Sequence, residues 1–90
     1  MNSAQRSVQI SKDLGLHLRA AGALVQLASR FRSDIWLSKG TVEANAKSIM
    51  SVLSLAAGKG AKLTLRATGE DAQDAIAALA QLVEAGFQQP

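Results

Sequence analysis

The sequence predicts a single α+β domain, in which a mainly antiparallel sheet of four strands carries three helices on one face. Four segments alternate apolar with polar residues, which is typical of strands buried on one side only. Three other segments space their apolar residues three and four positions apart, which is typical of amphipathic helices. The elements follow in the order β-α-β-β-α-β-α, and 90 residues suffice for one core, so we expect one domain over residues 1–90.

The first part of the chain predicts a strand, a loop and a helix. Val8 and Ile10 alternate with polar neighbours and mark the strand, and residues 12–16 form a loop that contains a glycine. Apolar spacing predicts the helix over residues 18–31. Gly22 lies inside this helix, where glycine is unfavourable, so we expect it to permit close packing against the sheet.

A hairpin and a short helix follow in the middle of the chain. Alternation marks strands around residues 35–37 and 42–44, and the turn sequence SKGT between them predicts that they pair. Trp36 then faces solvent on the outer side of the sheet. Ser48 is expected to cap a helix over residues 49–57, which stops at the sequence GKG.

The last third predicts one strand and one helix. Leucine and alanine alternate with polar residues over 63–67, the cleanest strand pattern in the sequence. The final helix covers residues 71–85 and ends at Gly86. Asp71 and Asp74 lie near its first turn, where the helix dipole favours acidic residues.

Composition excludes several kinds of site. The chain has no cysteine, which excludes disulfides, thiolate nucleophiles and zinc–thiolate sites, and a single histidine argues against a histidine-based metal cluster. We therefore expect no metal and no cofactor. No apolar run approaches the roughly 18 residues of a membrane span, and the first residues lack the apolar stretch of a signal peptide. The sequence favours a cytoplasmic protein that does not enter a membrane.

Charge is distributed unevenly along the chain. All ten Lys and Arg residues lie within the first 66 residues, and the last 24 residues hold four acids and no base. A basic face is compatible with nucleic acid, anionic ligands or acidic proteins. Three aromatic residues are too few for a stacking platform, which weakens nucleic-acid binding. From the residues alone, a basic RNA-binding module and a small-molecule regulatory domain stay open as alternatives.

His17 is the strongest candidate for chemistry. It follows Gly15 at a predicted helix start, where free backbone N–H groups and the positive end of the helix dipole favour an anion. Imidazole can take and release a charged group near neutral pH, and Arg19 adds a permanent cation that matches phosphate. The arrangement indicates a phosphate-accepting histidine. The structural alternative is that His17 only caps the helix or packs against the loop.

Ser48 is a second candidate, because a phosphate on a capping serine would lie on backbone N–H groups, with Lys47 nearby. The simpler interpretation is a helix cap. Apolar residues ringed by bases suit a transient protein interface, although Ile49 is expected to belong to the core. The candidate docking residues are Leu18, Arg19, Arg30, Lys47, Ile49, Met50 and Lys59.

Two segments resemble signatures of one known family. The sequence LGLHLRAA at residues 14–21 resembles the active-site signature of HPr, the histidine phosphocarrier of the bacterial phosphotransferase system. The sequence AKSIMSVL at residues 46–53 resembles the family's second signature, around a regulatory serine. The similarity extends over about residues 7–87 and implies an open-faced β-sandwich with four antiparallel strands and three helices.

The resemblance also implies a function. A carrier of this family, which has no turnover of its own, is phosphorylated on Nδ1 of the residue matched by His17. The donor is enzyme I, which takes its phosphate from phosphoenolpyruvate, and the acceptor is a IIA protein or domain. Arg19 matches the arginine that assists the exchange. Ser48 matches the serine that HPr kinase/phosphorylase modifies in many members.

The chain departs from the family pattern at three positions. Leu18 stands where a small residue is usual, Ala20 replaces the commoner proline, and Ser51 replaces a frequent glycine, which puts recognition by the kinase in question. Leu14 and the sequence EAGF at residues 84–87 are more similar to the nitrogen-related branch, NPr, than to sugar-transport HPr.

Overall fold

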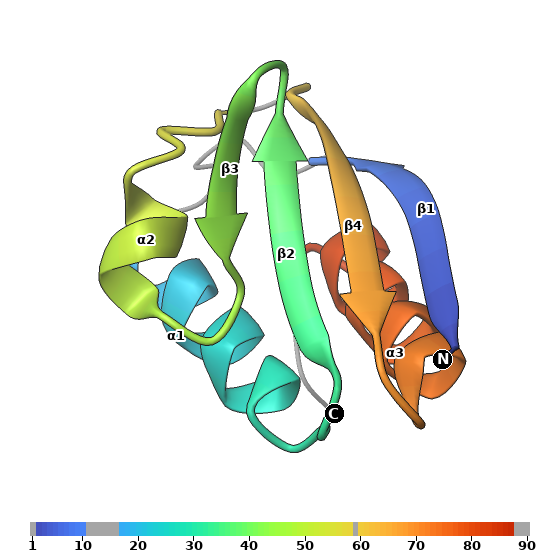
Figure 1. Ribbon diagram of the computed structural model, residues 1–90. Helices are drawn as coiled ribbons and strands as arrows, with labels where there is room; N and C mark the ends of the chain where they lie inside the picture. The colour runs from blue at the N-terminus through green and yellow to red at the C-terminus, as the bar shows by residue number, and fades with distance from the viewer. Residues whose placement is uncertain (1, 11–16, 59, 88–90) are drawn as a thin grey trace.

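The fold is built on one antiparallel sheet. The computed structural model of the 90-residue chain describes residues 2–10, 17–58 and 60–87. Its four strands lie in the order β1 (Ser3–Gln9), β4 (Lys62–Thr68), β2 (Asp34–Lys39) and β3 (Val42–Asn45), and every neighbouring pair is antiparallel. Helices α1 (Leu18–Ala28), α2 (Ile49–Leu53) and α3 (Ala72–Glu84) cover one face, as Figure 1 shows, so the predicted α+β architecture is confirmed.

Strand register places the alternating apolar residues on the covered face. Leu65 of β4 lies between Arg6 of β1 and Leu37 of β2, and Leu37 in turn faces Ala44 of β3. The three apolar members of this row are fully buried under the helices. Arg6 ends the row at the open edge of the sheet, where its guanidinium donates to the carboxylate of Glu84 on α3, 3.1 Å away. The register therefore fixes which residues form the core.

The other face of the sheet has no covering helix. Trp36 lies there, half-buried between its cross-strand neighbours Asn45 and Arg66, so the expected solvent-side position is confirmed. Arg66 also pairs with Glu43, with 2.8 Å between Nη2 and Oε2. This face is polar apart from the tryptophan.

Two sequence predictions about the first two helices need correction. Helix α1 ends at Ala28 rather than residue 31, and α2 ends at Leu53 rather than residue 57. After Leu53 the backbone makes tighter bonds to the third residue back, from the Leu55 and Ala56 N–H groups at 3.2 and 3.1 Å, and Ala56 has a left-handed φ of 49°, which ends the helix. Lys39 Nζ donates to the carbonyls of Leu55 and Ala56, at 3.2 and 3.3 Å. Leu55 and Ala57 are nevertheless buried in the core, so they continued the apolar pattern without being helical. The predicted loop at 12–16 lies outside the described residues.

Gly22 packs differently from the prediction. A Cβ atom built on Gly22 would lie 3.9 Å from Cδ1 of Ile49, so this part of α1 faces the start of α2 and not the sheet. Ile49, the first residue of α2, lies over the second turn of α1 at a distance that leaves room for a methyl group on Gly22. This contact brings the starts of the two helices close together.

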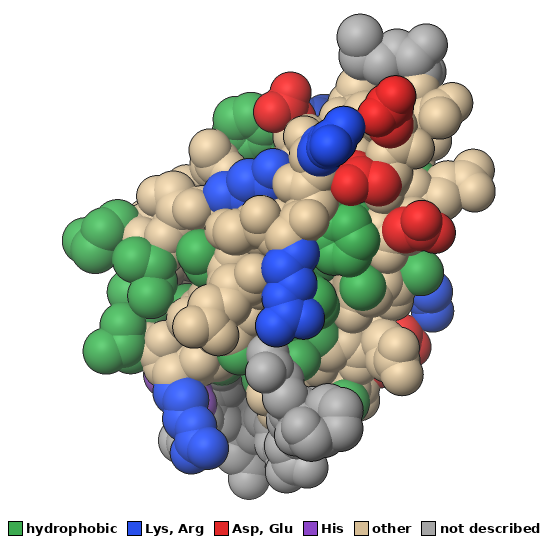
Figure 2. Space-filling view, turned by 90° about the horizontal axis from the view of Figure 1, so that it is seen from below, with side chains coloured by type: hydrophobic (Ala, Val, Ile, Leu, Met, Phe, Trp, Pro, Cys, Tyr) green, Lys and Arg blue, Asp and Glu red, His purple; other side chains and the backbone are tan. Residues whose placement is uncertain are grey.

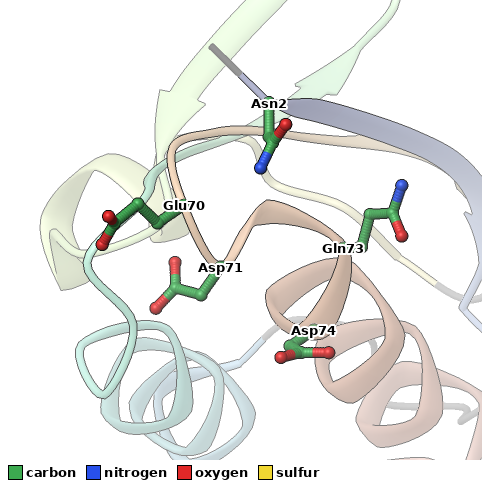
Figure 3. A pocket seen from close by; sticks show the side chains of 5 residues that line it. All are labelled: Asn2, Glu70, Asp71, Gln73 and Asp74. Carbon is green, nitrogen blue, oxygen red and sulfur yellow. The ribbon is translucent and has the colours of Figure 1, made fainter.

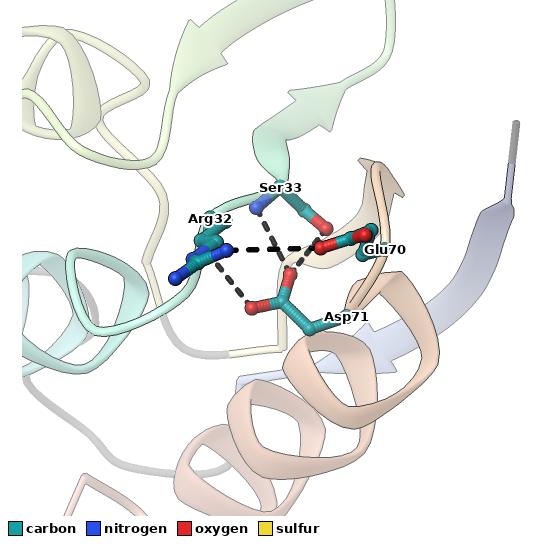
Figure 4. A network of polar contacts seen from close by, with 4 residues as sticks. All are labelled: Arg32, Ser33, Glu70 and Asp71. Carbon is teal, nitrogen blue, oxygen red and sulfur yellow. Dashed lines mark hydrogen bonds and ion pairs between the residues drawn. The ribbon is translucent and has the colours of Figure 1, made fainter.

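The segment that follows α1 is held by the carboxylate of Asp71, the residue just before α3. Asp71 accepts hydrogen bonds from the backbone N–H groups of Arg32 and Ser33, at 2.8 and 2.9 Å, and from the Ser33 hydroxyl at 2.5 Å (Figure 4). The Ser33 hydroxyl above all, then the Arg32 N–H, lower the pKa of Asp71 to about 2. Because its carboxylate is engaged across the fold, Asp71 makes no side-chain cap for its own helix. This network anchors the segment that links α1 to β2.

Candidate functional site

His17 is the N-cap of α1, and its ring faces the helix start. Its backbone is extended, and its carbonyl accepts the first helical hydrogen bond, from the Ala21 N–H at 2.8 Å. The ring atom Nδ1 accepts from the Arg19 N–H at 3.2 Å. The residue is half-buried. The structural alternative, a capping histidine, is therefore observed, in a residue that is not fully buried.

The cap determines which ring nitrogen holds a lone pair. Since Nδ1 accepts a hydrogen bond, the proton of the neutral imidazole belongs on Nε2. The lone pair of Nδ1 is the nucleophilic electron pair of the ring. It lies where the free N–H groups of α1 converge, and the first turn of this helix contains no acidic residue. The site can thus attack an electrophile and hold an anion in the same place.

Both the backbone and the side chain of Arg19 lie at this site. Its backbone N–H orients the His17 ring, and its side chain is exposed at the second position of α1. Arg19 follows His17 by two residues, and a guanidinium matches the geometry and charge of a phosphate group. In Figure 2 the single histidine, in purple, is partly covered by a basic side chain at the lower left.

Ser48 is the N-cap of α2, as predicted. Its Oγ accepts from the Ser51 N–H at 3.3 Å, and its carbonyl accepts from the Val52 N–H at 3.0 Å. Ser51, one of the departures from the family pattern, ties this helix to β3 because its hydroxyl accepts from the Asn45 N–H at 2.9 Å. The hydroxyl of Ser48 is half-buried at a helix start.

Asn45 is a site-supporting residue that sequence reasoning missed. Its Oδ1 accepts from the Lys47 N–H at 2.9 Å, which closes a turn just before Ser48. The sequence signal was present, because an asparagine side chain often accepts from the backbone N–H two residues on, and Asn45 lies three residues ahead of the cap Ser48.

The candidate docking residues divide into two groups. Leu18 and Met50 have 65% and 73% of their surface exposed, and Arg19 and Arg30 are exposed as well. Ile49 is 36% exposed, so the prediction that it belongs to the core is wrong: it lies at the boundary, over Gly22.

Lys47 and Lys59 differ from the other docking candidates. The ammonium of Lys47 donates to the Phe31 carbonyl at 2.7 Å, and the residue is half-buried rather than free on the surface. It therefore ties the Ser48 segment to the chain that follows α1. Lys59 lies outside the described residues.

A pocket lies at another end of the molecule, away from His17. Figure 3 shows its lining side chains around the start of α3: Asn2, Glu70, Asp71, Gln73 and Asp74. Within residues 2–10, 17–58 and 60–87, no group of three or more His, Cys, Asp or Glu side chains is arranged to hold a metal ion. None of the helices in those ranges is both long enough and apolar enough to span a membrane.

Comparison with known proteins gives a consistent result. The family model described as "PTS HPr component phosphorylation site" matches residues 4–85. The phosphocarrier protein HPr of Neisseria meningitidis is 40% identical over 83 residues, which are 92% of this chain and 93% of that protein. The HPr-like protein Crh of Bacillus subtilis is 45% identical over 80 residues, 89% of this chain and 94% of Crh.

A solved structure extends the comparison to three dimensions. HPr-C-His from Thermoanaerobacter tengcongensis superimposes with a TM-score of 0.91 at 40% sequence identity, over 97% of this chain and 98% of that one. The likeness thus includes both the fold and the sequence over almost the whole chain.

Proposed function

Because this chain belongs to the HPr family of phosphotransferase-system phosphocarriers, we propose that His17 accepts a phosphoryl group on Nδ1 from enzyme I and passes it to a IIA protein or domain. Enzyme I is taken to be phosphorylated by phosphoenolpyruvate. The observation that carries the proposal is the His17 ring at the start of α1, with Nδ1 directed at the Arg19 N–H.

The first transfer is a displacement at phosphorus. The Nδ1 lone pair of His17 forms a new N–P bond as the bond from phosphorus to the donor atom of enzyme I breaks, and that bond's electron pair stays with enzyme I. The proton on Nε2 is retained. The Arg19 N–H, now without the lone pair as acceptor, donates to a phosphate oxygen, and the Arg19 guanidinium offsets the added charge.

The second transfer reverses the first. The acceptor atom of the IIA protein or domain attacks the same phosphorus, the N–P bond breaks, and its electron pair returns to Nδ1. The ring is regenerated, so the protein acts as a carrier between two partners and consumes no substrate of its own.

The test is phosphorylation with labelled phosphoenolpyruvate and enzyme I. We expect one acid-labile, base-stable phosphate per chain, lost in His17→Asn. Asparagine is a good N-cap, so this variant keeps an acceptor for the Arg19 N–H while it removes the nucleophile. The control Gln26→Ala changes an exposed residue of α1 and should label like the wild type. Equal labelling of His17→Asn would refute the assignment.

We also propose that Ser48 is a regulatory phosphorylation site for an HPr kinase/phosphorylase. Phosphate there would place about two negative charges beside the exposed Met50 and Ile49 and repel an acidic partner. Ser48→Asp should weaken partner binding, whereas Ser7→Asp, on the uncovered sheet face, should not. Unchanged transfer rates in Ser48→Asp would count against regulation by charge.

A further inference from the structure

The first turn of α1 offers backbone N–H groups that the helix itself does not use. The first N–H to join the ladder of helical hydrogen bonds is that of Ala21, which donates to the His17 carbonyl at 2.8 Å. The N–H groups of Leu18, Arg19 and Ala20 precede it and have no acceptor inside the helix. The Arg19 N–H donates to Nδ1 of His17 at 3.2 Å, which leaves the other two donors.

Ala20 holds the more unusual of these two donors. Leu18 is an exposed residue, whereas Ala20 is 4% exposed. Among residues 2–10, 17–58 and 60–87, no atom accepts a hydrogen bond from the Ala20 N–H. A donor in a buried residue that has no acceptor costs free energy, and few such groups occur in folded proteins. The fold alone gives no reason for this one.

The place of this donor relative to the His17 ring supplies a reason. A side chain at the N-cap of a helix accepts from the second or the third N–H of the first turn. In α1 the second is that of Arg19, which Nδ1 of His17 already accepts, and the third is that of Ala20. Both N–H groups point toward the start of the helix, as all N–H groups of a first turn do. A group attached to Nδ1 that carries several acceptor atoms therefore meets both donors.

We propose that the Ala20 N–H is a second backbone donor to the phosphoryl group on His17, beside the Arg19 N–H. The inference rests on the proposed function and adds a residue that binds the transferred group. A phosphoryl group has three oxygens that accept hydrogen bonds, so two of them take the two N–H groups at once. Both N–H groups keep their protons during the transfer. The N–P bond forms from the Nδ1 lone pair, and the electron pair of the broken bond stays with enzyme I.

This role distinguishes Ala20 from Arg19 in its effect on the transfer. The Arg19 N–H has an acceptor before and after the transfer, first Nδ1 and then a phosphate oxygen. The Ala20 N–H gains its acceptor only in the phosphorylated chain, and the new hydrogen bond is strengthened by the negative charge. Position 20 is also one at which the chain departs from the family pattern, and proline there would have no N–H to donate. The Ala20 N–H therefore favours the phosphorylated form of this chain.

The experiment compares Ala20→Pro with Ala20→Gly. Proline removes the N–H and is tolerated in the first turn of a helix, whereas glycine removes the side chain and keeps the N–H. Each variant is mixed with enzyme I that carries labelled phosphate, and the equilibrium partition of the label between the two proteins is measured. Thermal unfolding verifies that the variants fold. We expect Ala20→Pro to shift the partition toward enzyme I by about tenfold or more, the effect of one hydrogen bond to a charged group. Ala20→Gly should partition like the wild type, and equal partition in all three proteins would overturn the proposal.

The amide resonances of the wild-type chain give a second test, which needs no variant. On phosphorylation by enzyme I, the Ala20 amide proton should move downfield and exchange more slowly with solvent, because its N–H gains a charged acceptor. Ala28, the last residue of α1, serves as the reference and should not shift. An unchanged Ala20 signal in a chain labelled on His17 refutes the role of Ala20, even where Ala20→Pro does not fold. Absence of labelling in the wild type refutes the proposed function itself.

Discussion

Replacing Gly22 by alanine should stabilise the protein. Glycine in a helix interior costs about 0.5–1 kcal/mol relative to alanine, mainly through the freedom of the unfolded chain. The new methyl group would lie 3.9 Å from Cδ1 of Ile49, an ordinary van der Waals contact, so no neighbour has to move. Partial burial of that methyl adds at most about 0.8 kcal/mol.

The expected gain is about 1 kcal/mol, which raises the unfolding midpoint of a domain of this size by roughly 4–8 °C. Thermal and urea unfolding followed by circular dichroism measure it. Gly69→Ala is the opposite case, because its Cβ would lie 2.6 Å from the Ser33 hydroxyl oxygen and 2.8 Å from Ser33 Cα, at a φ of +149°. That variant should lose stability. A lower midpoint for Gly22→Ala would show that α2 packs on α1 more tightly than this spacing indicates, and would refute the reasoning about how the two helix starts meet.

Two further predictions concern the long-range anchors. The pKa of Asp71 is lowered from 3.8 to about 2, so its stabilising effect is complete above about pH 4 and is lost as the pH falls toward 2. Urea unfolding across this range should show a steeper loss for the wild type than for Asp71→Asn, and equal slopes would contradict the assignment. Lys47→Met should lower the free energy of unfolding by about 1–2 kcal/mol, because a half-buried Phe31 carbonyl loses a charged donor. Lys62→Met, on the uncovered face of β4, serves as its control and should change little.

Local sequence patterns were sufficient for most of the fold. The strand β4 was predicted because its leucines alternate strictly, and α3 because its apolar stripe is uninterrupted up to Gly86. Helix α2 was predicted too long for a physical reason. Leu55 and Ala57 keep the apolar spacing and are buried, but the backbone there tightens into a turn and Ala56 adopts a left-handed φ of 49°, which no apolar pattern reveals.

The site was predictable where it depends on neighbours in sequence. His17, Arg19 and Ser48 are placed at helix starts by residues within a few positions, and both helix starts formed as expected. Contacts across the fold were not predictable in this way. Asp71 and Ser33 are 38 residues apart, and Lys47 and Phe31 are 16 apart, so no local pattern links them. The burial of the Lys47 side chain and the exposure of Ile49 both follow from such contacts.

The double role of the His17 ring explains how a helix start can serve reversible chemistry. Before transfer, Nδ1 satisfies the Arg19 N–H, a donor that would otherwise have no partner within α1. Under the proposed reaction the lone pair is consumed, yet each phosphate oxygen offers the same N–H a stronger, charged acceptor. The helix start therefore keeps an acceptor in both states, and α1 does not have to rearrange. Because the Arg19 N–H exchanges one acceptor for another, only the difference between its two hydrogen bonds favours the phosphorylated form. That limits how strongly this donor opposes release of the phosphate, which is what a carrier between two partners requires.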